Sequence, residues 1–392
     1  MSEIKVNSIK GVGASTAAIT VNNTDGTCTA NLTNRTNKNL IINGDMRIAQ
    51  RGTSSTGTGY QTVDRFQTGT SGVDETPTQA QADVAAGTTP YTLGFRKSFK
   101  VTNGNQTSGA GASDVVDIKH VFEAQDIANS GWNYLSSSSF ITLSFWVKSS
   151  VAQNFFGHVK TFDGTVYNYP FSTGSLSADT WTKITKTIPG NSNLQIDNDN
   201  GSGLEIRFAL FYGTDKTASV SENAWAAYDN TQRTPDNTST WYTTNDATFE
   251  ITGVQLEVGD TATDFEHRSF AQELALCQRY FYMHASGDFD LVNTDRCPIG
   301  LGYGYTSTAG FVLITFPTQM RTDPTLYKVV GTDYFNFAYN GNNGFPNDIS
   351  VNRMSSQVAE ISFHTGSSWD QNAAGMFRTY NSAARVGFTA EL

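Results

Sequence analysis

The chain has 392 residues, enough for two or three domains, and its 36 acidic and 26 basic residues give a formal net charge of −10. That balance disfavours nucleic acid and anionic membrane surfaces as partners, because both are bound by basic faces. Only 16% of the residues are charged while 12% are aromatic, which is typical of an all-β protein with many turns.

The N-terminal residues lack the apolar stretch of a signal peptide, and the longest clean apolar run, residues 311–316, is far shorter than a membrane span. We therefore expect a protein that is made in a reducing cytoplasm and does not insert into membranes. Cys28, Cys277 and Cys297 show no metal-ligand spacing, so we expect idle thiols, no bound metal and no cofactor.

Residues 1–38 form a first unit of short β segments, at residues 4–9 and 18–21, separated by turn residues and free of aromatic side chains. A segment with so little apolar surface does not fold alone. Two alternatives remain, either simple disorder or completion by other copies of the chain. The alternating pattern favours an oligomer-ordered segment.

Residues 39–268 are predicted to form a two-sheet β-sandwich. In residues 140–148 the apolar side chains alternate with polar ones, which predicts a strand with a core face and an opposite face. Residues 181–188 alternate in the same way, with Ile184 and Ile188 on the core face. Residues 204–212 predict a central buried strand, and residues 249–258 predict the last strand of this domain.

Residues 269–284 are predicted to be a linking helix, with the helical turns over about 270–283. Ser269 and Gln272 have the spacing of a capping box, in which each side chain bonds to the backbone N–H of the other residue. Leu274, Cys277 and Phe281 form an apolar stripe that needs a packing partner.

Residues 285–392 are predicted to be a C-terminal β domain with a sandwich-like fold. Its expected strands include residues 311–316, 357–364 and 383–392. The sequence Gly300-Leu-Gly-Tyr-Gly304 lacks the third glycine of a dinucleotide-binding turn, and we interpret it as a flexible strand at a sheet edge.

Four passages, taken in chain order, resemble a recurring pattern in bacteriophage tail fibres and related virion appendages. They are residues 39–52, 63–66, 142–148 and 253–281. The resemblance implies that residues 39–268 form a jelly-roll middle domain similar to carbohydrate-binding modules. It also implies a homotrimer, a virion anchor at residues 1–38 and a distal receptor-binding tip at residues 285–392. Residues 1–9 also resemble the N-terminal anchors of phage appendages, and residues 316–324 resemble the start of the family's terminal β domain.

No catalytic motif is present, so we predict that the protein is not an enzyme. Glu205, Glu250 and Glu257 lie on predicted strands and would make a glycosidase pair only if two of them converged. Residues 197–201 resemble the start of a calcium loop but fail the EF-hand pattern, so a plain polar turn is the favoured interpretation.

Aromatic side chains in polar segments are the candidate ligand-binding residues, because sugar C–H faces stack on such rings. The candidates are Trp225, Tyr228, Trp241, Tyr242, Tyr334 and Tyr339. The alternative is that these rings pack against the domains or fill a subunit interface. Trp146 and Trp181 are expected to be structural.

The predicted function is therefore that of a structural virion protein, a phage tail fibre that mediates attachment to the host cell surface. The expected partners are phage tail or adaptor proteins, bound through residues 1–38, and a host surface polysaccharide or other receptor. The alternatives are a free carbohydrate-binding protein and a polysaccharide depolymerase.

Overall fold

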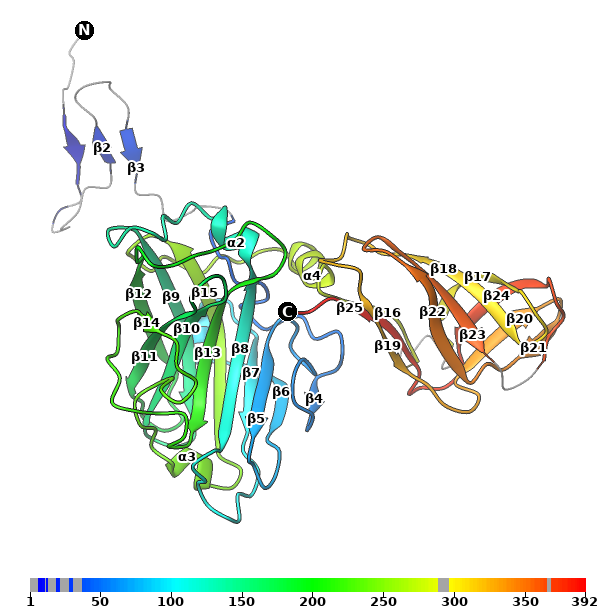
Figure 1. Cartoon of the computed structure of the whole chain (residues 1–392), viewed down its shortest axis with the longest axis horizontal. Helices are drawn as coiled ribbons and strands as arrows, with labels where there is room; N and C mark the ends of the chain where they lie inside the picture. The colour runs from blue at the N-terminus through cyan, green and yellow to red at the C-terminus, as the bar shows by residue number, and fades with distance from the viewer. Residues whose placement is uncertain are drawn as a thin grey trace, which may run out of the picture.

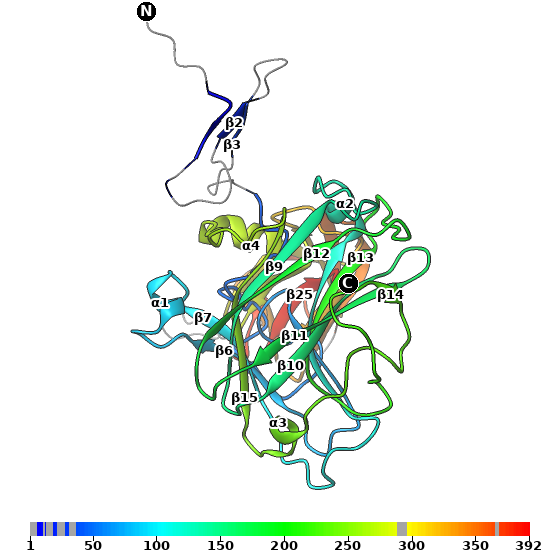
Figure 2. The same ribbon diagram turned by 90° about the vertical axis from the view of Figure 1, so that its left-hand side faces the viewer.

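The computed structural model describes residues 6–10, 12, 19–21, 28–30, 37–287, 296–364 and 368–392. It confirms the all-β class, since all the paired strands are antiparallel and the helices are short. Much of the predicted anchor lies outside the described residues. Its described parts are β1 (Ser8–Ile9), β2 (Ile19–Val21) and β3 (Cys28–Ala30), which pair in that order. They lie beyond one end of the neighbouring sandwich (Figures 1 and 2).

The larger domain is a sandwich of two six-stranded sheets. The first sheet contains, in spatial order, β14 (Ala226–Ala227), β11 (Tyr167–Ser175), β10 (Asn154–Thr161), β13 (Ser202–Tyr212), β8 (Val115–Glu123) and β5 (Gln67–Ser71). The second contains β12 (Thr182–Pro189), β9 (Phe140–Ser149), β15 (Thr248–Val258), β7 (Lys97–Thr102), β6 (Thr78–Asp83) and β4 (Ser54–Ser55). The helices α2 (Ala124–Ala128) and α4 (Phe270–Gln278) lie at one end of the sandwich, and α3 (Thr240–Thr243) lies at the other (Figures 1 and 2).

The predicted alternation along β9 is confirmed. Its core-facing side chains are fully buried between the two sheets: Ile141, Leu143, Phe145 and Val147. The opposite face is less exposed than the pattern suggests, because Thr142 and Ser144 are buried there. Residues 259–267 cover this face, and Thr142 Oγ1 donates a hydrogen bond to the Gly259 carbonyl over 2.8 Å. A chain segment that follows the sandwich thus supplies a cover that β9 alone cannot show.

The helix α4 begins as predicted and ends earlier. Ser269 and Gln272 form the capping box, with both reciprocal hydrogen bonds present. The helix stops at Gln278, and Phe281 starts the strand β16 (Phe281–Ser286). The predicted extension to residue 283 is wrong because Tyr280 and Phe281 are buried where the two domains meet, which pulls the chain into the next sheet.

The C-terminal domain has a three-stranded sheet facing a seven-stranded sheet around one core. The smaller sheet contains β16, β25 (Arg385–Thr389) and β19 (Thr325–Val329). The larger contains β21 (Asn342–Gly344), β20 (Phe335–Tyr339), β24 (Ala374–Thr379), β17 (Pro298–Gly304), β18 (Ala309–Thr315), β23 (Val358–His364) and β22 (Asp348–Met354). The glycine-rich strand β17 lies between β24 and β18, so its predicted place at a sheet edge is wrong.

A buried charge cluster joins the two domains beside α4. Arg65 is 1% exposed, forms an ion pair with Glu391 near the C-terminus, and places its guanidinium 3.5 Å from the centre of the Tyr280 ring. Burial alone would lower the pKa of Arg65, but the adjacent Glu391 carboxylate raises it, which keeps the cation charged. Arg279 donates two hydrogen bonds to Glu123 across the same junction, over 2.6 and 2.8 Å.

Candidate functional site

Trp225 ends the long segment between β13 and β14, Tyr228 lies just after β14, and both are half-buried. The Trp225 indole donates a hydrogen bond to the Pro189 carbonyl over 2.7 Å, and its ring packs 5.2 Å from that of Tyr169. The Tyr228 hydroxyl donates to Asn230 over 3.1 Å. Trp225 thus fastens this segment to the sandwich, while both rings keep some exposed surface.

Trp241 and Tyr242 lie on α3 and are buried, so neither presents a ring face to solvent. Tyr242 stacks on Phe211 with ring centres 4.3 Å apart, and its hydroxyl donates to Asp114 over 2.9 Å. Packing, the alternative considered for these residues, accounts for both positions.

Tyr334 and Tyr339 belong to the C-terminal domain, far along the chain from the other candidates. Tyr339 is buried and stacks on Phe337 with ring centres 5.1 Å apart. Tyr334 is half-buried and packs against the C-terminal core. The six predicted aromatic residues therefore occupy three separate places and do not form one site.

The segment that follows β14 covers a polar network on the outer face of the first sheet, because its Arg233 guanidinium lies 5.3 Å from the centre of the Tyr212 ring. Arg207 donates to Asp117 over 3.0 Å and to Glu205 over 3.1 Å, and the Tyr212 hydroxyl donates to Asp117 over 2.8 Å. His158 is fully buried beside Tyr212, and burial, aided by the nearby Arg207 cation, lowers the pKa of His158 to about 3. This network contacts the segment that covers it and presents no open surface to a ligand.

The predicted carboxylates do not converge. Glu205 lies on the outer face of the first sheet, whereas Glu250 and Glu257 lie on the outer face of the second, so the core separates them. Glu250 and Glu257 are seven residues apart on β15, roughly 23 Å along an extended strand, which is too far for a glycosidase pair. In residues 197–201, Asp199 accepts a hydrogen bond from the Gly201 N–H over 2.8 Å, as a polar turn requires.

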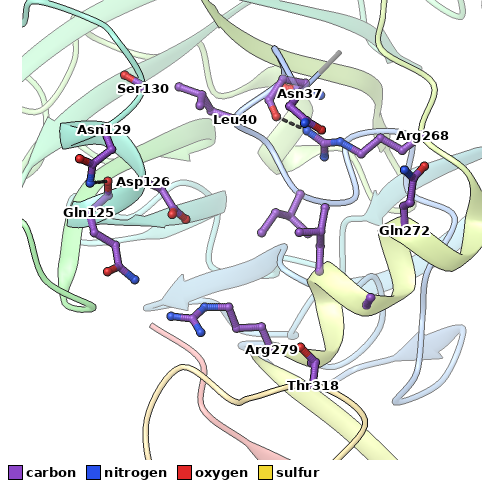
Figure 3. Close-up of a pocket in the computed structure, with 14 residues that line it drawn as sticks. Asn37, Leu40, Gln125, Asp126, Asn129, Ser130, Arg268, Gln272, Arg279 and Thr318 are labelled. Carbon is purple, nitrogen blue, oxygen red and sulfur yellow. Dashed lines mark hydrogen bonds between the residues drawn. The ribbon is translucent and has the colours of Figure 1, made fainter.

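A hollow of about 860 Å³ lies beside α4, between α2 and the loop that carries Thr318 (Figure 3). Its polar lining includes Asp126, Arg268, Gln272 and Arg279, and its lining contains no aromatic side chain. The Arg268 guanidinium donates hydrogen bonds to the Asn39 and Ile41 carbonyls, and these bonds connect the start of the sandwich to its end. This hollow therefore lacks a stacking surface for a sugar.

A second pocket, of about 350 Å³, lies on the outer face of the second sheet, under residues 259–267. It is lined by Thr92, Leu93, Phe95, Ser144, Trp146, Lys183, Gly253, Thr263, Asp264, Phe265 and His267. One wall is aromatic, because the Phe95 ring lies 4.9 Å from Phe265 and 5.3 Å from His267. Gly253 has φ +60° at a bulge in β15, and a Cβ there would lie 2.6 Å from the Phe95 ring. The pocket wall therefore depends on glycine at this position.

Trp146 and Lys183 also line the pocket, and they are direct cross-strand partners on β9 and β12. Trp146 is half-exposed, and Lys183 is exposed. Within the described parts of the chain, no hydrogen bond or ion pair engages the Trp146 indole N–H, the Ser144 hydroxyl or the Lys183 ammonium. The pocket thus combines a flat ring with polar groups that are available to a ligand.

Sequence reasoning assigned Trp146 a structural role and did not find this pocket. The available signal was the position of Trp146 on the face of β9 opposite its core residues, next to Ser144 and Lys148. The other walls come from residues 92–95 and 253–267, which only the fold brings to β9.

No protein-family model and no curated protein matches the chain. Among solved structures, it is similar to the enzymatically active domain of tailspike protein 4 from Bacteriophage CBA120, with 11% identity and a TM-score of 0.30 over 56% of this chain and 21% of that one. It is also similar to a putative sugar-binding protein from Bacteroides thetaiotaomicron, with 10% identity and a TM-score of 0.30 over 57% of this chain and 100% of that one.

A third similar structure is the N-terminal cellulose-binding domain of a Cellulomonas fimi β-1,4-glucanase, with 11% identity and a TM-score of 0.27 over 54% of this chain and 97% of that one. Likeness at this level says nothing about what the present chain binds. The class that the fold itself defines is an all-β protein with a two-sheet sandwich and a second β domain.

Proposed function

We propose that this chain is a structural protein of a phage particle, a tail fibre or related appendage, and that its sandwich binds glycans on the host surface. The support for the virion role is the order of four sequence passages that resemble phage appendages, residues 39–52, 63–66, 142–148 and 253–281. A homotrimer, attachment to tail or adaptor proteins through residues 1–38, and location on the virion belong to the same proposal.

The pocket beside Trp146 is the observation that carries glycan binding. The apolar C–H face of a sugar ring stacks on an indole, while hydroxyl, ammonium and carboxylate groups bind sugar hydroxyls. Trp146, Ser144, Lys183 and Asp264 supply this combination in one pocket of about 350 Å³. The polar network under the segment that follows β14 has stronger charges but no open surface, which makes it the weaker candidate.

Replacing Trp146 tests the pocket directly. We expect Trp146→Ala to weaken binding to host surface polysaccharide about tenfold or more, since losing a stacked ring removes about 1.4 kcal/mol or more of binding free energy. Binding is measured by calorimetry or on a glycan array with the full-length protein.

The matched control is Trp181→Ala. Trp181 is half-buried next to β12, lies under the Lys148 ammonium and does not line the pocket. Equal losses in both variants, or unchanged binding in Trp146→Ala, would reject the pocket as the glycan site.

The virion role is tested on purified particles. Mass spectrometry should detect the chain in stoichiometric amounts. Particles that carry the Trp146→Ala variant should still contain the chain but should adsorb poorly to host cells. A chain that is absent from particles but binds polysaccharide in the lysate would instead support the free carbohydrate-binding protein.

A further inference from the structure

The strand β17 has an inverted apolar pattern. Its glycines face the core, where a Cβ at Gly302 would lie 3.0 Å from the Phe377 ring and one at Gly304 would lie 2.6 Å from Trp369. The large side chains between them, Leu301 and Tyr303, therefore face outward. The apolar side chains of β17 therefore lie on the outer face of the seven-stranded sheet. In most sandwich strands the large apolar side chains face the core instead.

Neighbouring strands extend this outer apolar face. Met376 on β24 lies directly opposite Leu301, and Leu313 on β18 is the next partner in the β17–β18 register. The exposed fractions are 76% for Leu301, 64% for Leu313, 57% for Tyr305, 47% for Tyr303 and 37% for Met376. Side chains that stay this exposed on three adjacent strands form a continuous patch, which we call the β17 patch.

The chemistry of the β17 patch fits a protein surface better than a sugar. Its centre, Leu301, Leu313 and Met376, has no hydrogen-bonding side-chain group apart from a weak thioether, and sugar hydroxyls need polar partners. Leucine, methionine and tyrosine instead resemble the buried centre of a subunit interface. A contiguous apolar patch of this kind on a soluble protein marks an interaction surface.

Charges of opposite sign flank the patch. Arg378 lies on β24 at one side, and its Nε donates a hydrogen bond to Asn336 over 2.7 Å. Glu360 lies on β23 at the other side, directly opposite Leu313, and accepts a hydrogen bond from Asn352. Among the described residues neither charge has an ion-pair partner, and Arg353, which faces Glu360 across β22, does not pair with it.

We propose that the β17 patch binds a second copy of this chain, with Arg378 of one copy against Glu360 of the next. A surface with a cation on one flank and a carboxylate on the other complements itself when copies follow head to tail, and such contacts form a ring when the rotation between successive copies divides a full turn. The interface lies in the C-terminal domain and is independent of the Trp146 pocket and of the proposed glycan binding.

Light scattering on the full-length chain tests this interface. The native protein should have a mass that is a multiple of the 42.6 kDa protomer, and Leu301→Asp with Leu313→Asp should reduce it to one protomer. The control Leu135→Asp replaces a leucine that is 50% exposed on the sandwich, and it should leave the mass unchanged. Circular dichroism checks that every variant is folded.

Charge reversal separates pairing from simple loss of structure. Arg378→Glu alone and Glu360→Arg alone should each raise the dissociation constant about tenfold or more, and the double variant should recover most of the loss. A native protein of one-protomer mass would overturn the proposal. So would a folded double-aspartate variant that keeps the native mass, or a double charge reversal no better than the single ones. Glycan binding by these variants reports on the Trp146 pocket and remains a separate result.

Discussion

Single buried residues set the acid sensitivity of the sandwich. His158 is fully buried against Tyr212 and near Arg207, and its pKa is lowered to about 3. Because the folded protein resists protonation there while the unfolded chain accepts a proton near pH 6.5, His158 contributes stability above pH 6.5 that is lost as pH falls toward 3.

Replacing His158 should therefore flatten the pH dependence. Between pH 6.5 and about 3, His158→Gln should reduce the loss of unfolding free energy by up to about 1.4 kcal/mol per pH unit. Urea unfolding at several pH values measures this slope. The lowered pKa of His120 acts in the same direction and keeps part of the slope. His364→Gln, an exposed control, should leave the slope as it is, and an unchanged slope in His158→Gln would contradict the argument.

At the scale of elements, the residue alternation of β17 does not show which of its faces is buried until the neighbouring strands of its sheet are known. Phe377 and Trp369 pack closely against β17 because its inward-facing residues are glycines, and its large side chains face outward. The sequence suggested a flexible edge because glycine is unfavourable in a strand interior. In the structure this cost is offset by aromatic rings that occupy the space above the glycines.

Adding one methyl group to β17 tests this packing. A Cβ at Gly302 would lie 2.0 Å from the Phe311 carbonyl oxygen, so Gly302→Ala should destabilise the C-terminal domain by about 1–3 kcal/mol. Chemical denaturation followed by fluorescence measures the change. Ala374→Val adds atoms to the exposed side of β24 and should change stability by no more than about 0.5 kcal/mol. Equal effects of the two substitutions would show that the inward side of β17 has room.

At the scale of the whole molecule, buried ion pairs couple the sandwich to the C-terminal domain. Arg65 comes from one of the passages that resemble phage appendages, and its partner Glu391 lies at the other end of the chain. Gln50 also comes from one of these passages, and its side-chain amide donates to the carbonyl of Phe281, the first residue of β16, over 2.7 Å. Several residues of these recurring passages thus serve the junction between domains, while Trp146 lines a pocket.

Breaking the central pair should loosen the two domains. Glu391→Gln leaves the buried Arg65 cation without its carboxylate, so we expect a loss of about 3 kcal/mol and two separate transitions in calorimetry where the native protein has one. The Lys97–Asp83 pair is exposed, and Asp83→Asn should leave the melting curve unchanged. A single unshifted transition in Glu391→Gln would mean that apolar contacts alone hold the domains together.

Local features were predictable from the sequence. The alternation of β9 and the capping box of Ser269 and Gln272 depend on residues that are neighbours in the chain, so their patterns carry the structure directly. The all-β class followed from composition and such patterns. The burial of Trp241 and Tyr242 did not follow, because a polar segment can hold aromatic rings inside or outside.

What the sequence by itself determined is the class of the fold, the main strands and the start of the one long helix. The tertiary structure alone decided where α4 ends, which side of β17 is exposed, and that Trp146 faces Phe265 and His267 in one pocket. The physical reason is that strand and helix patterns arise from interactions between near neighbours, whereas pockets, domain junctions and exposed faces depend on contacts between segments tens to hundreds of residues apart.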